Sequence, residues 1–481
     1  MHLHTLHINH HSLLFPYLTE RQESQSIEEI FSLYQPYAGV ITKQITYFPP
    51  GGTLPAYVGH AEYADIDVLV SAMNDGAIVQ TPFQKNMFAG GKGLTLSDMT
   101  ISSLAEGVER IAGALNACAW QPMRGSYEQL TNEGYPCLSP DKIPLLATEQ
   151  YATENQPYLP FTKQSSLGWV KGIRLFSGQE IWVPAQLVLP FYLPDEDEDR
   201  IGYATTGGLA CHINKEQALR HGILELIERD AVNLHWVCRK APRRILIDRI
   251  PRHPRLARMI EIIKKLPLEL HFLLHETKFN VPVVTVIHLN PAFRKNGYAP
   301  GGGVGETLEE AILYALGEYA QAEGTMRLAQ LAPEWQLSKA THRLFELPED
   351  AKPKDITTFF KAIPYYGYPS NARKLEWYLQ GEEISLSDYE DHFQAPESNS
   401  FAQVLETLKA HDLDPITFDL TPPQFKQGRL IKSWIPELTS PYVAARPLWG
   451  NPRYYETPSQ LGWTEQKLSF AELNKDPQPY P

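Results

Sequence analysis

The stretch GGLACHINKEQALRHGILELIERDAVNLHW, residues 207–236, decides the fold that we expect for this chain. A pair of glycines leads into a predicted helix that carries Glu225 and Glu228, followed by Arg229. A spacing of three residues places both carboxylates on one face of the helix. The helix is apolar on nearly every side around them, and such a helix is usually buried. Because buried carboxylates must be paired or must bind a metal ion, the stretch predicts a functional site.

Two further segments, 90–116 and 300–327, follow the same plan of glycines and then an acidic helix. Apolar residues recur at helical spacing in the first of them. The polar positions are Glu106, Glu109 and Arg110 in the helix of segment 90–116, and Glu318 and Gln321 in the helix of segment 300–327. Strands and helices alternate along the chain, which predicts an α/β fold of layered helices and mixed sheets. We expect the three glycine-led acidic helices to pack on these sheets around one site.

Composition excludes several classes of protein. The chain has 481 residues, of which 43% are hydrophobic and 21% charged, as in ordinary soluble proteins. Its net charge of −13 disfavours a nucleic-acid partner. The longest apolar runs, such as 281–287, are shorter than the roughly 18 residues that span a membrane. The His-rich residues 1–15 contain no secretory signal, and we interpret them as a polar start rather than a metal site. We therefore expect a cytoplasmic protein without a membrane contact.

The order of the segments predicts one large domain with additions. We expect a lead-in at 1–38, a catalytic domain at 39–440 and a C-terminal segment at 441–481. Residues 330–400 have weak periodicity, and we interpret them as a variable insertion or a set of surface helices. The acidic run 195–199 and the basic segment 239–265 are interpreted as solvated surface, although the basic segment could also meet an acidic partner. The four cysteines form no CxxC pair, which favours reduced thiols over a zinc site.

If the three helices converge, five carboxylates share one cavity. They belong to Glu106, Glu109, Glu225, Glu228 and Glu318. Like charges so close cannot all stay ionised without cations, and Mg²⁺ takes oxygen ligands and brings phosphates with it. The donors Lys92, Arg110 and Arg229 suit those phosphates. Since GxxxxGK[ST] is absent, we predict a magnesium–ATP site without a Walker loop. A single ExxER is a common surface pattern, so the prediction depends on the repetition.

At these residues the sequence resembles the YcaO family, which activates peptide backbone amides with ATP. The motifs that carry the resemblance are Gly91-Lys92-Gly93 with Ser102-x3-Glu106-x2-Glu109-Arg110, then Gly208-Leu209-Ala210 through Ala218 to Glu225-Leu226-Ile227-Glu228-Arg229-Asp230-Ala231, and finally Ala311-x6-Glu318-x2-Gln321. Weaker similarities are Trp169 with Val183-Pro184-Ala185, Asp419-Leu420-Thr421 and Pro436-Glu437-Leu438. The resemblance extends from about Gly39 to the end of the chain.

The resemblance implies roles for single residues. The implied magnesium ligands are Glu106, Glu109, Glu225, Glu228 and Glu318, and the implied nucleotide contacts are Lys92, Ser102, Arg229 and Gln321, to which the basic Arg110 is added. Two positions depart from the family pattern. Gln217 stands where an acid often precedes the alanine of the second helix, and Tyr314 stands where the third helix often has Arg. One metal ligand and one phosphate contact are therefore missing from the expected set.

The final residues resemble the PxPxP ending of YcaO members that form azolines. Here the prolines are Pro477, Pro479 and Pro481, and composition alone would favour a frayed tail. The resemblance implies instead that the tail reaches the active site beside Arg229, and the carboxylate of Pro481 is a candidate general base. It also implies cyclodehydration: a Cys, Ser or Thr side chain attacks the preceding carbonyl, ATP phosphorylates the hemiorthoamide oxygen, and phosphate leaves to give a thiazoline or oxazoline.

The resemblance also implies partners. They are a ribosomal precursor peptide, a separate E1-like protein that binds its leader, and an FMN-dependent azoline dehydrogenase. We expect a homodimer within a larger complex. Two alternatives stay open: a YcaO enzyme that forms thioamides or amidines, which the PxPxP ending argues against, and a non-catalytic scaffold subunit, which Gln217 and Tyr314 would favour.

Overall fold

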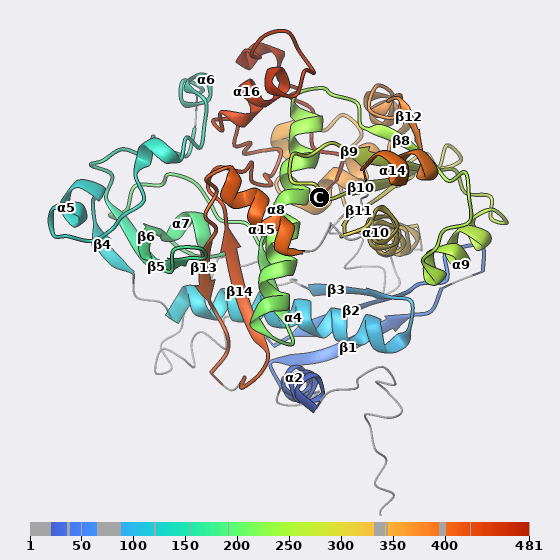
Figure 1. Ribbon diagram of the computed structural model, residues 1–481, viewed down its shortest axis with the longest axis horizontal. Helices are drawn as coiled ribbons and strands as arrows, with labels where there is room; N and C mark the ends of the chain where they lie inside the picture. The colour runs from blue at the N-terminus through green and yellow to red at the C-terminus, as the bar shows by residue number, and fades with distance from the viewer. Residues whose placement is uncertain are drawn as a thin grey trace, which may run out of the picture.

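In the residues that the structure describes, three sheets and three long helices form the framework, with shorter helices around them (Figure 1). The computed structural model describes residues 21–35, 39–49, 51–64, 88–119, 122–154, 156–190, 192–330, 342, 345–393, 401–423 and 425–480. The His-rich residues 1–15 and the catalytic candidate Pro481 lie outside the described residues. Within them, the layered arrangement of helices on mixed sheets confirms the expected fold class.

The first sheet carries the first acidic helix. Its strands pair antiparallel in the order β1 (Ile41–Tyr47), β2 (Tyr57–Tyr63) and β3 (Phe88–Gly93). Helix α4 (Leu96–Ala119) lies across this sheet, and the short helix α2 (Arg21–Ser32) contacts α4. Glycine allows this close approach, because a Cβ at Gly91 would lie 2.4 Å from the Ser103 side chain. The GGKG strand is therefore a packing surface for α4.

The second sheet carries α8 (Lys215–Val237), the helix predicted from the opening stretch. Its strand order is β4 (Met123–Gly125), β5 (Leu167–Arg174), β13 (Ile416–Asp419), β14 (Arg429–Trp434) and β7 (Leu209–His212). A sixth strand, β6 (Glu180–Pro184), also pairs with β5. Strands β5 and β6 form an antiparallel hairpin. Residues 223–237 of α8 are almost all buried, as its apolar composition predicts.

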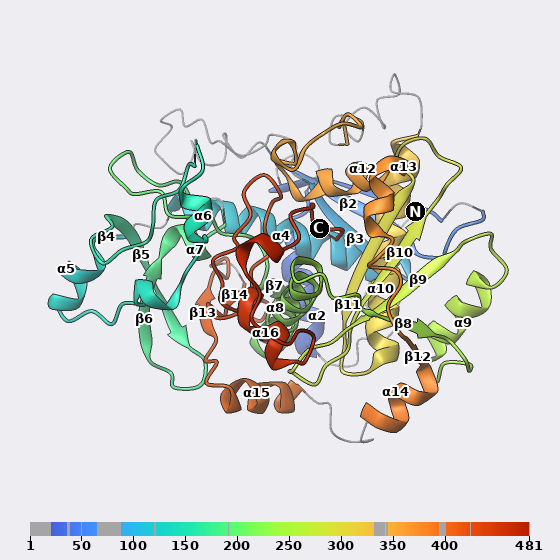
Figure 2. The ribbon, with the colours of Figure 1, turned by 90° about the horizontal axis from the view of Figure 1, so that it is seen from above.

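The third sheet carries α10 (Leu308–Leu328) and α9 (Pro254–Ile263). Its order is β11 (Tyr298–Val304), β10 (Val283–Leu289), β9 (Leu270–His275), β8 (Arg243–Leu246) and β12 (Glu383–Ser385). Only the β8–β12 pair of this sheet is parallel. Figure 2 shows α8 in the middle of the molecule, between the second and third sheets. The three acidic helices consequently meet where the sheets meet.

The region interpreted as an insertion contributes to the interior. Strand β12 extends the third sheet, and helices α12 (Ala362–Tyr366), α13 (Pro369–Ala372) and α14 (Leu386–Phe393) belong to the same region. Tyr365, Tyr366 and Tyr378 are each 1% exposed or less and join a cluster with Trp236 of α8. Surface helices therefore do not describe residues 345–393. The expected domain boundaries themselves stay a prediction.

The acidic run 195–199 is only partly solvated. The Glu198 side chain is 1% exposed and pairs with Arg124. Its carboxylate also accepts the hydroxyl of Tyr192 at 2.7 Å and the N–H of Gly168 at 2.8 Å. A solvated loop is therefore wrong for Glu198, because its carboxylate replaces water by protein donors.

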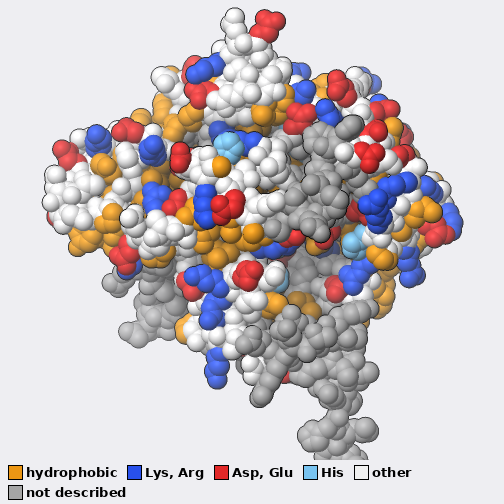
Figure 3. All heavy atoms as spheres, viewed as in Figure 1, with side chains coloured by type: hydrophobic (Ala, Val, Ile, Leu, Met, Phe, Trp, Pro, Cys, Tyr) orange, Lys and Arg blue, Asp and Glu red, His pale blue; other side chains and the backbone are white. Residues whose placement is uncertain are grey.

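The basic segment 239–265 is largely neutralised within the molecule. Figure 3 shows Lys and Arg side chains gathered on the side that carries α9, with acidic side chains among them. The ion pairs are Arg243–Glu276, Arg244–Glu383, Arg249–Glu309, Arg255–Asp98 and Lys265–Glu261. This internal pairing supports the interpretation as a solvated face rather than as a surface for an acidic partner.

Candidate nucleotide and metal site

The glycine turn before β7 holds the first carboxylate of α8. Gly208 has a φ of +79°, in the left-handed region that glycine adopts without strain. Its N–H donates to the carboxylate of Glu225 at 2.8 Å. A Cβ at this position would lie 2.4 Å from the carbonyl oxygen of Ser433. Both the conformation and the close approach of β14 therefore require glycine here.

Glu109 of α4 faces the same turn. Its carboxylate accepts the N–H of Cys211 at 2.7 Å. Burial raises the pKa of Glu109 to about 8, and the nearby carboxylates of Glu106 and Glu225 act in the same direction. Arg110 partly offsets this effect and pairs with Glu106 at 3.0 Å. Carboxylates from α4 and α8 are thus close enough to repel one another.

Arg229 lies among the acids of α8. Its guanidinium nitrogens are 3.8 Å from the carboxylates of Glu225 and Glu228, and its Cζ is 4.5 Å from the centre of the Tyr480 ring. Burial raises the pKa of Glu228, Arg229 lowers it, and Glu318 and Glu225 raise it. The pair spacings are longer than a direct hydrogen bond, so Arg229 compensates the acids without neutralising any one of them completely.

Glu318 of α10 completes the acidic group. Lys92 from β3 forms an ion pair with one carboxylate oxygen of Glu318. Tyr480 donates its hydroxyl to the other oxygen, and the N–H of Gly302 lies 3.3 Å from that oxygen. Although burial raises the pKa of Glu318, the charges of Lys92 and Arg229 hold it below its ordinary value. This carboxylate is therefore ionised beside two cations.

The remaining predicted contacts lie at the edge of β3. The hydroxyl oxygen of Ser102 lies 3.5 Å from the N–H of Lys92. A Cβ at Gly90 would lie 1.8 Å from the side-chain nitrogen of Gln321, so this amide packs directly on the strand. The structure therefore brings α4, α8, α10 and β3 together, as the glycine-led helices predict. The roles assigned to the single residues stay predictions.

The donors present fit a hard divalent cation. Oxygen ligands dominate the group. Burial, and to a smaller extent the neighbouring carboxylates, raise the pKa of Glu109 and Glu228, and a cation would relieve the repulsion between these acids. In the part of the chain that the structure describes, no three His, Cys, Asp or Glu side chains are already grouped as metal ligands. Lys92, Arg110 and Arg229 lie between the carboxylates instead. Binding of a metal would therefore require these cations to turn toward phosphates.

Three residues in or beside the site were missed by the sequence analysis. His221 lies four residues before Glu225 and has an exposed side chain. Desolvation lowers its pKa, and the charges of Glu225, Lys92 and Glu318 also act on it. Its helical spacing from Glu225 is a signal that could have identified it. Lys432 and Tyr480 carry no comparable signal, because their partners are distant in sequence.

The two departures from the expected ligand set lie in different surroundings. The N–H of Gln217 in the first turn of α8 donates to the N-cap Asn214 at 2.9 Å, and the neighbouring Glu216 is exposed. Partial burial raises the pKa of Tyr314, whereas the nearby guanidinium of Arg220 lowers it. A cation from α8 therefore stands close to the position where the third helix lacks Arg.

The tail is docked rather than frayed. Its backbone carbonyls accept hydrogen bonds from Trp236 to Asp476, from Tyr366 to Pro477 and from Tyr298 to Pro479. Gln478 donates to Asn233. Successive residues of the tail are thus fixed against α8, α12 and β11, and the chain enters the acidic site at Tyr480. The docking of Pro477 and Pro479 agrees with the expected path of the tail.

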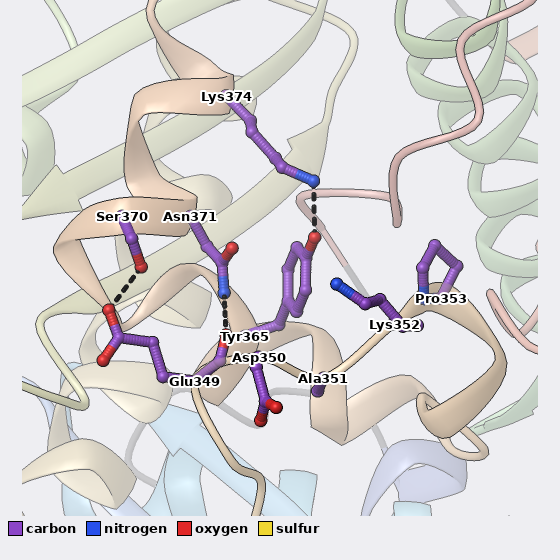
Figure 4. A pocket seen from close by; sticks show the side chains of 9 residues that line it. All are labelled: Glu349, Asp350, Ala351, Lys352, Pro353, Tyr365, Ser370, Asn371 and Lys374. Atoms are coloured by element: carbon purple, nitrogen blue, oxygen red, sulfur yellow. Dashed lines mark hydrogen bonds between the residues drawn. The ribbon is translucent and has the colours of Figure 1, made fainter.

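A cavity of about 540 Å³ adjoins the anchor of the tail (Figure 4). It is lined by Glu349, Asp350, Ala351, Lys352, Pro353, Tyr365, Ser370, Asn371 and Lys374. Lys374 donates to the Tyr365 hydroxyl at 2.7 Å (Figure 4) and to Asp476, whose side chain is not drawn there, at 2.6 Å. None of the predicted site residues lines this cavity. The cavity therefore lies outside the acidic site and is joined to the tail by the Lys374–Asp476 contact.

Lys432 of β14 forms hydrogen bonds with the backbone of the glycine turn. The side chain is 2% exposed and donates to the carbonyl oxygens of Thr205, at 2.8 Å, and Gly207. Burial lowers the pKa of Lys432 to about 8, and Glu225 partly offsets this effect. Removal of this ammonium would leave two buried carbonyls without a donor.

The substitution Lys432→Met is expected to change the pH dependence of stability. Between about pH 8 and about pH 10.4, the ordinary pKa of lysine, the unfolded chain binds more protons at this position than the folded one. Wild-type stability relative to the variant should therefore rise with pH, by on the order of 2 kcal/mol. Urea unfolding of both proteins at the two ends of this range measures the difference. Parallel pH profiles would contradict the assignment of a depressed pKa.

The arrangement defines a class: a layered protein of helices and mixed sheets with a buried acidic site for a phosphate-bearing ligand. The chain belongs to the YcaO family, since the family model described as "YcaO cyclodehydratase, ATP-ad Mg2+-binding" matches residues 90–439. This description says that members of the family bind ATP and Mg²⁺. An uncharacterized protein of Methanothermobacter thermautotrophicus is 36% identical over 80 residues, which are 17% of this chain and 21% of that protein.

Solved structures share the fold. A heterocyclase in complex with substrate and cofactor matches with a TM-score of 0.69 and 20% identity, over 95% of this chain and 57% of that chain. The heterocyclase TruD matches with a TM-score of 0.59 and 19% identity, over 95% and 54%. YcaO from Methanopyrus kandleri, bound with AMPPCP and Mg²⁺, matches with a TM-score of 0.52 and 18% identity, over 83% and 86%. The chain therefore spans little more than half the length of the two heterocyclases.

Among the helices in the described ranges, none has both the length and the apolar character needed to cross a membrane.

Proposed function

We propose that the protein is an ATP-dependent cyclodehydratase that converts Cys, Ser or Thr of a ribosomal precursor peptide to thiazoline or oxazoline. The observation that carries this proposal is the docked tail, which places Tyr480 between Glu318 and Arg229 in the acidic site. A tail confined to that site can meet a peptide and a nucleotide at once. The family match to a cyclodehydratase description supports the same reaction.

Each group of residues has a proposed role. The five carboxylates would hold Mg²⁺, and Lys92, Ser102, Arg110, Arg229 and Gln321 would hold the nucleotide. When bound, Mg²⁺–ATP supplies the phosphoryl group that turns the substrate amide oxygen into a leaving group. The side chain of the peptide loses its proton and adds to the preceding carbonyl, which closes the ring. The resulting oxygen would take the phosphoryl group and release ADP, and phosphate and the amide proton would then leave as the C=N bond forms. The docked prolines keep water away from the reacting carbonyl.

The proposed partners follow from this chemistry. They are the precursor peptide, an E1-like protein that binds its leader, and an FMN-dependent dehydrogenase that oxidises azolines, with the chain as a homodimer in the complex. The Escherichia coli microcin synthetase McbBCD complex with pro-MccB17 bound, whose matching chain has a TM-score of 0.52 and 12% identity over 84% of this chain and 90% of that one, supports the assembly by fold alone.

The mass of the product separates this proposal from its first alternative. Ring formation removes one water per modified residue, whereas thioamide formation exchanges oxygen for sulfur. A precursor peptide rich in Cys, Ser and Thr is incubated with the protein, the leader-binding partner, Mg²⁺–ATP and a sulfide source, and then analysed by mass spectrometry. Loss of water at Cys, Ser or Thr is the expected result. A gain corresponding to sulfur for oxygen would replace the proposal by the thioamide reaction.

The substitutions Glu225→Gln and Glu228→Gln test the non-catalytic scaffold. Each removes one carboxylate charge beside Arg229 and is expected to lower ADP release by at least about a hundredfold, since such groups stabilise charge in the transition state. ADP release is measured with the partners present. The exposed Glu456→Gln on α16 (Arg453–Gln460) is the matched control and should retain wild-type rates. The scaffold gains support if the wild type and all three variants release no ADP.

A further inference from the structure

Tyr480 lies inside the acidic site, although the sequence motif assigns a role only to the prolines around it. The residue is 5% exposed. Its ring lies against Arg229, whose Cζ is 4.5 Å from the ring centre. A Cβ at Gly302 would lie 2.4 Å from the ring, so the ring rests directly on strand β11. Tyr480 is therefore enclosed by α8, α10 and β11.

The hydroxyl of Tyr480 contributes to the orientation of Glu318. One carboxylate oxygen of Glu318 is bound by Lys92. The other accepts the Tyr480 hydroxyl, with the N–H of Gly302 at 3.3 Å. Donors on both sides fix the plane of the carboxylate as well as its position. Loss of the hydroxyl would leave Lys92 and one long backbone contact to hold Glu318.

The position of Tyr480 is set by the residues before it. Tyr366, Asn233 and Tyr298 bind the tail residues that precede Tyr480. None of these three hydrogen bonds involves an acidic residue of the site. The tail therefore delivers the Tyr480 side chain to Glu318 and Arg229 from an independent set of contacts. Anchoring and orientation can consequently be separated by mutation.

We propose that Tyr480 is a positioning residue that orients the Glu318 carboxylate through its hydroxyl and the Arg229 guanidinium through its ring. The inference rests on the proposed function, because it assigns Glu318 to Mg²⁺ and Arg229 to the nucleotide. The Tyr480 hydroxyl then contributes to the affinity of the site for Mg²⁺, independently of any single hydrogen bond that anchors the tail.

Binding measurements on three variants test this inference. The probe is a non-hydrolysable ATP analogue, titrated at several Mg²⁺ concentrations into the full chain by calorimetry. The variant Tyr480→Phe keeps the ring and should need about tenfold more Mg²⁺ for half-maximal nucleotide binding, the effect of losing a hydrogen bond to a charged group. The variant Tyr480→Leu should also weaken nucleotide binding several-fold at saturating Mg²⁺, because it removes the ring beside Arg229.

The variant Tyr366→Phe is the matched control, since it removes a hydroxyl that anchors the tail without touching the acidic site. Its Mg²⁺ requirement should equal that of the wild type, and thermal unfolding without ligand confirms that each variant is folded. An unchanged Mg²⁺ requirement in Tyr480→Phe, or an equal increase in Tyr366→Phe, overturns the inference alone. Failure of the wild type to bind the Mg²⁺–nucleotide overturns the proposed function together with it.

Discussion

Deletion of residues 477–481 abolishes ring formation while the three sheets stay folded. This is the expected result because the deletion removes the segment that enters the acidic site and meets Glu318 and Arg229. Loss of a positioned acid–base group alone lowers rates by about a hundredfold to ten thousandfold. Ring formation is measured as loss of water from the precursor peptide, and folding is measured by circular dichroism and urea unfolding.

A matched control separates the tail from the C-terminal segment in general. Lys467 lies in the same segment, its side chain is 68% exposed, and it pairs only with Glu456 on the surface. The variant Lys467→Ala should therefore form rings at the wild-type rate. We expect the deletion to lower the unfolding temperature somewhat, because Gln478 and Tyr480 are buried. Wild-type ring formation by the deleted protein would remove the tail from the mechanism.

The substitution Asp230→Ala is expected to destabilise the protein more than any other single change in α8. Asp230 is 1% exposed, accepts the N–H and hydroxyl of Thr439 at 2.9 and 3.0 Å, and pairs with Arg453 at 2.5 and 2.9 Å. Removal of one partner of a buried pair leaves the other charge uncompensated, at a cost of about 3–5 kcal/mol. The free energy of unfolding in urea measures this loss.

The double variant Asp230→Ala with Arg453→Met isolates the pair. Because the second substitution removes the uncompensated guanidinium, the double variant should be more stable than Asp230→Ala alone. The exposed pair Lys467–Glu456 provides the comparison, since the removal of either partner there should cost about 1 kcal/mol or less. Additive losses in the double variant would show that Asp230 and Arg453 contribute separately.

The parts of the fold that the sequence predicted are those with a local signal. The apolar residues within each segment predict helices α4, α8 and α10. The glycine pair before α8 predicts a turn, which Gly208 makes with a positive φ. The convergence of the acidic residues was a hypothesis that the repeated glycine-led helices favoured, because a buried carboxylate must be paired or must bind a metal ion.

The parts that the sequence could not predict depend on partners far away along the chain. Glu198 appears solvated within an acidic run, and only the position of Arg124 explains its burial. Lys432 stands between Ile431 and Ser433 in β14, and nothing local indicates that it reaches the carbonyls before Gly208. The aromatic residues of 345–393 show no periodicity because irregular turns, rather than one long helix, bring them into the interior.

The anchoring of the tail has a consequence for folding kinetics. The hydrogen bonds from Trp236 to Asp476 and from Gln478 to Asn233 join residues 240 and 245 positions apart. Chain closure over such separations is slow compared with the formation of a helix or hairpin. The secondary structure of α8 and of the sheets therefore forms before the tail docks. The acidic site is completed as the final step, because a partly folded chain has not yet brought Tyr480 to Glu318 and Arg229.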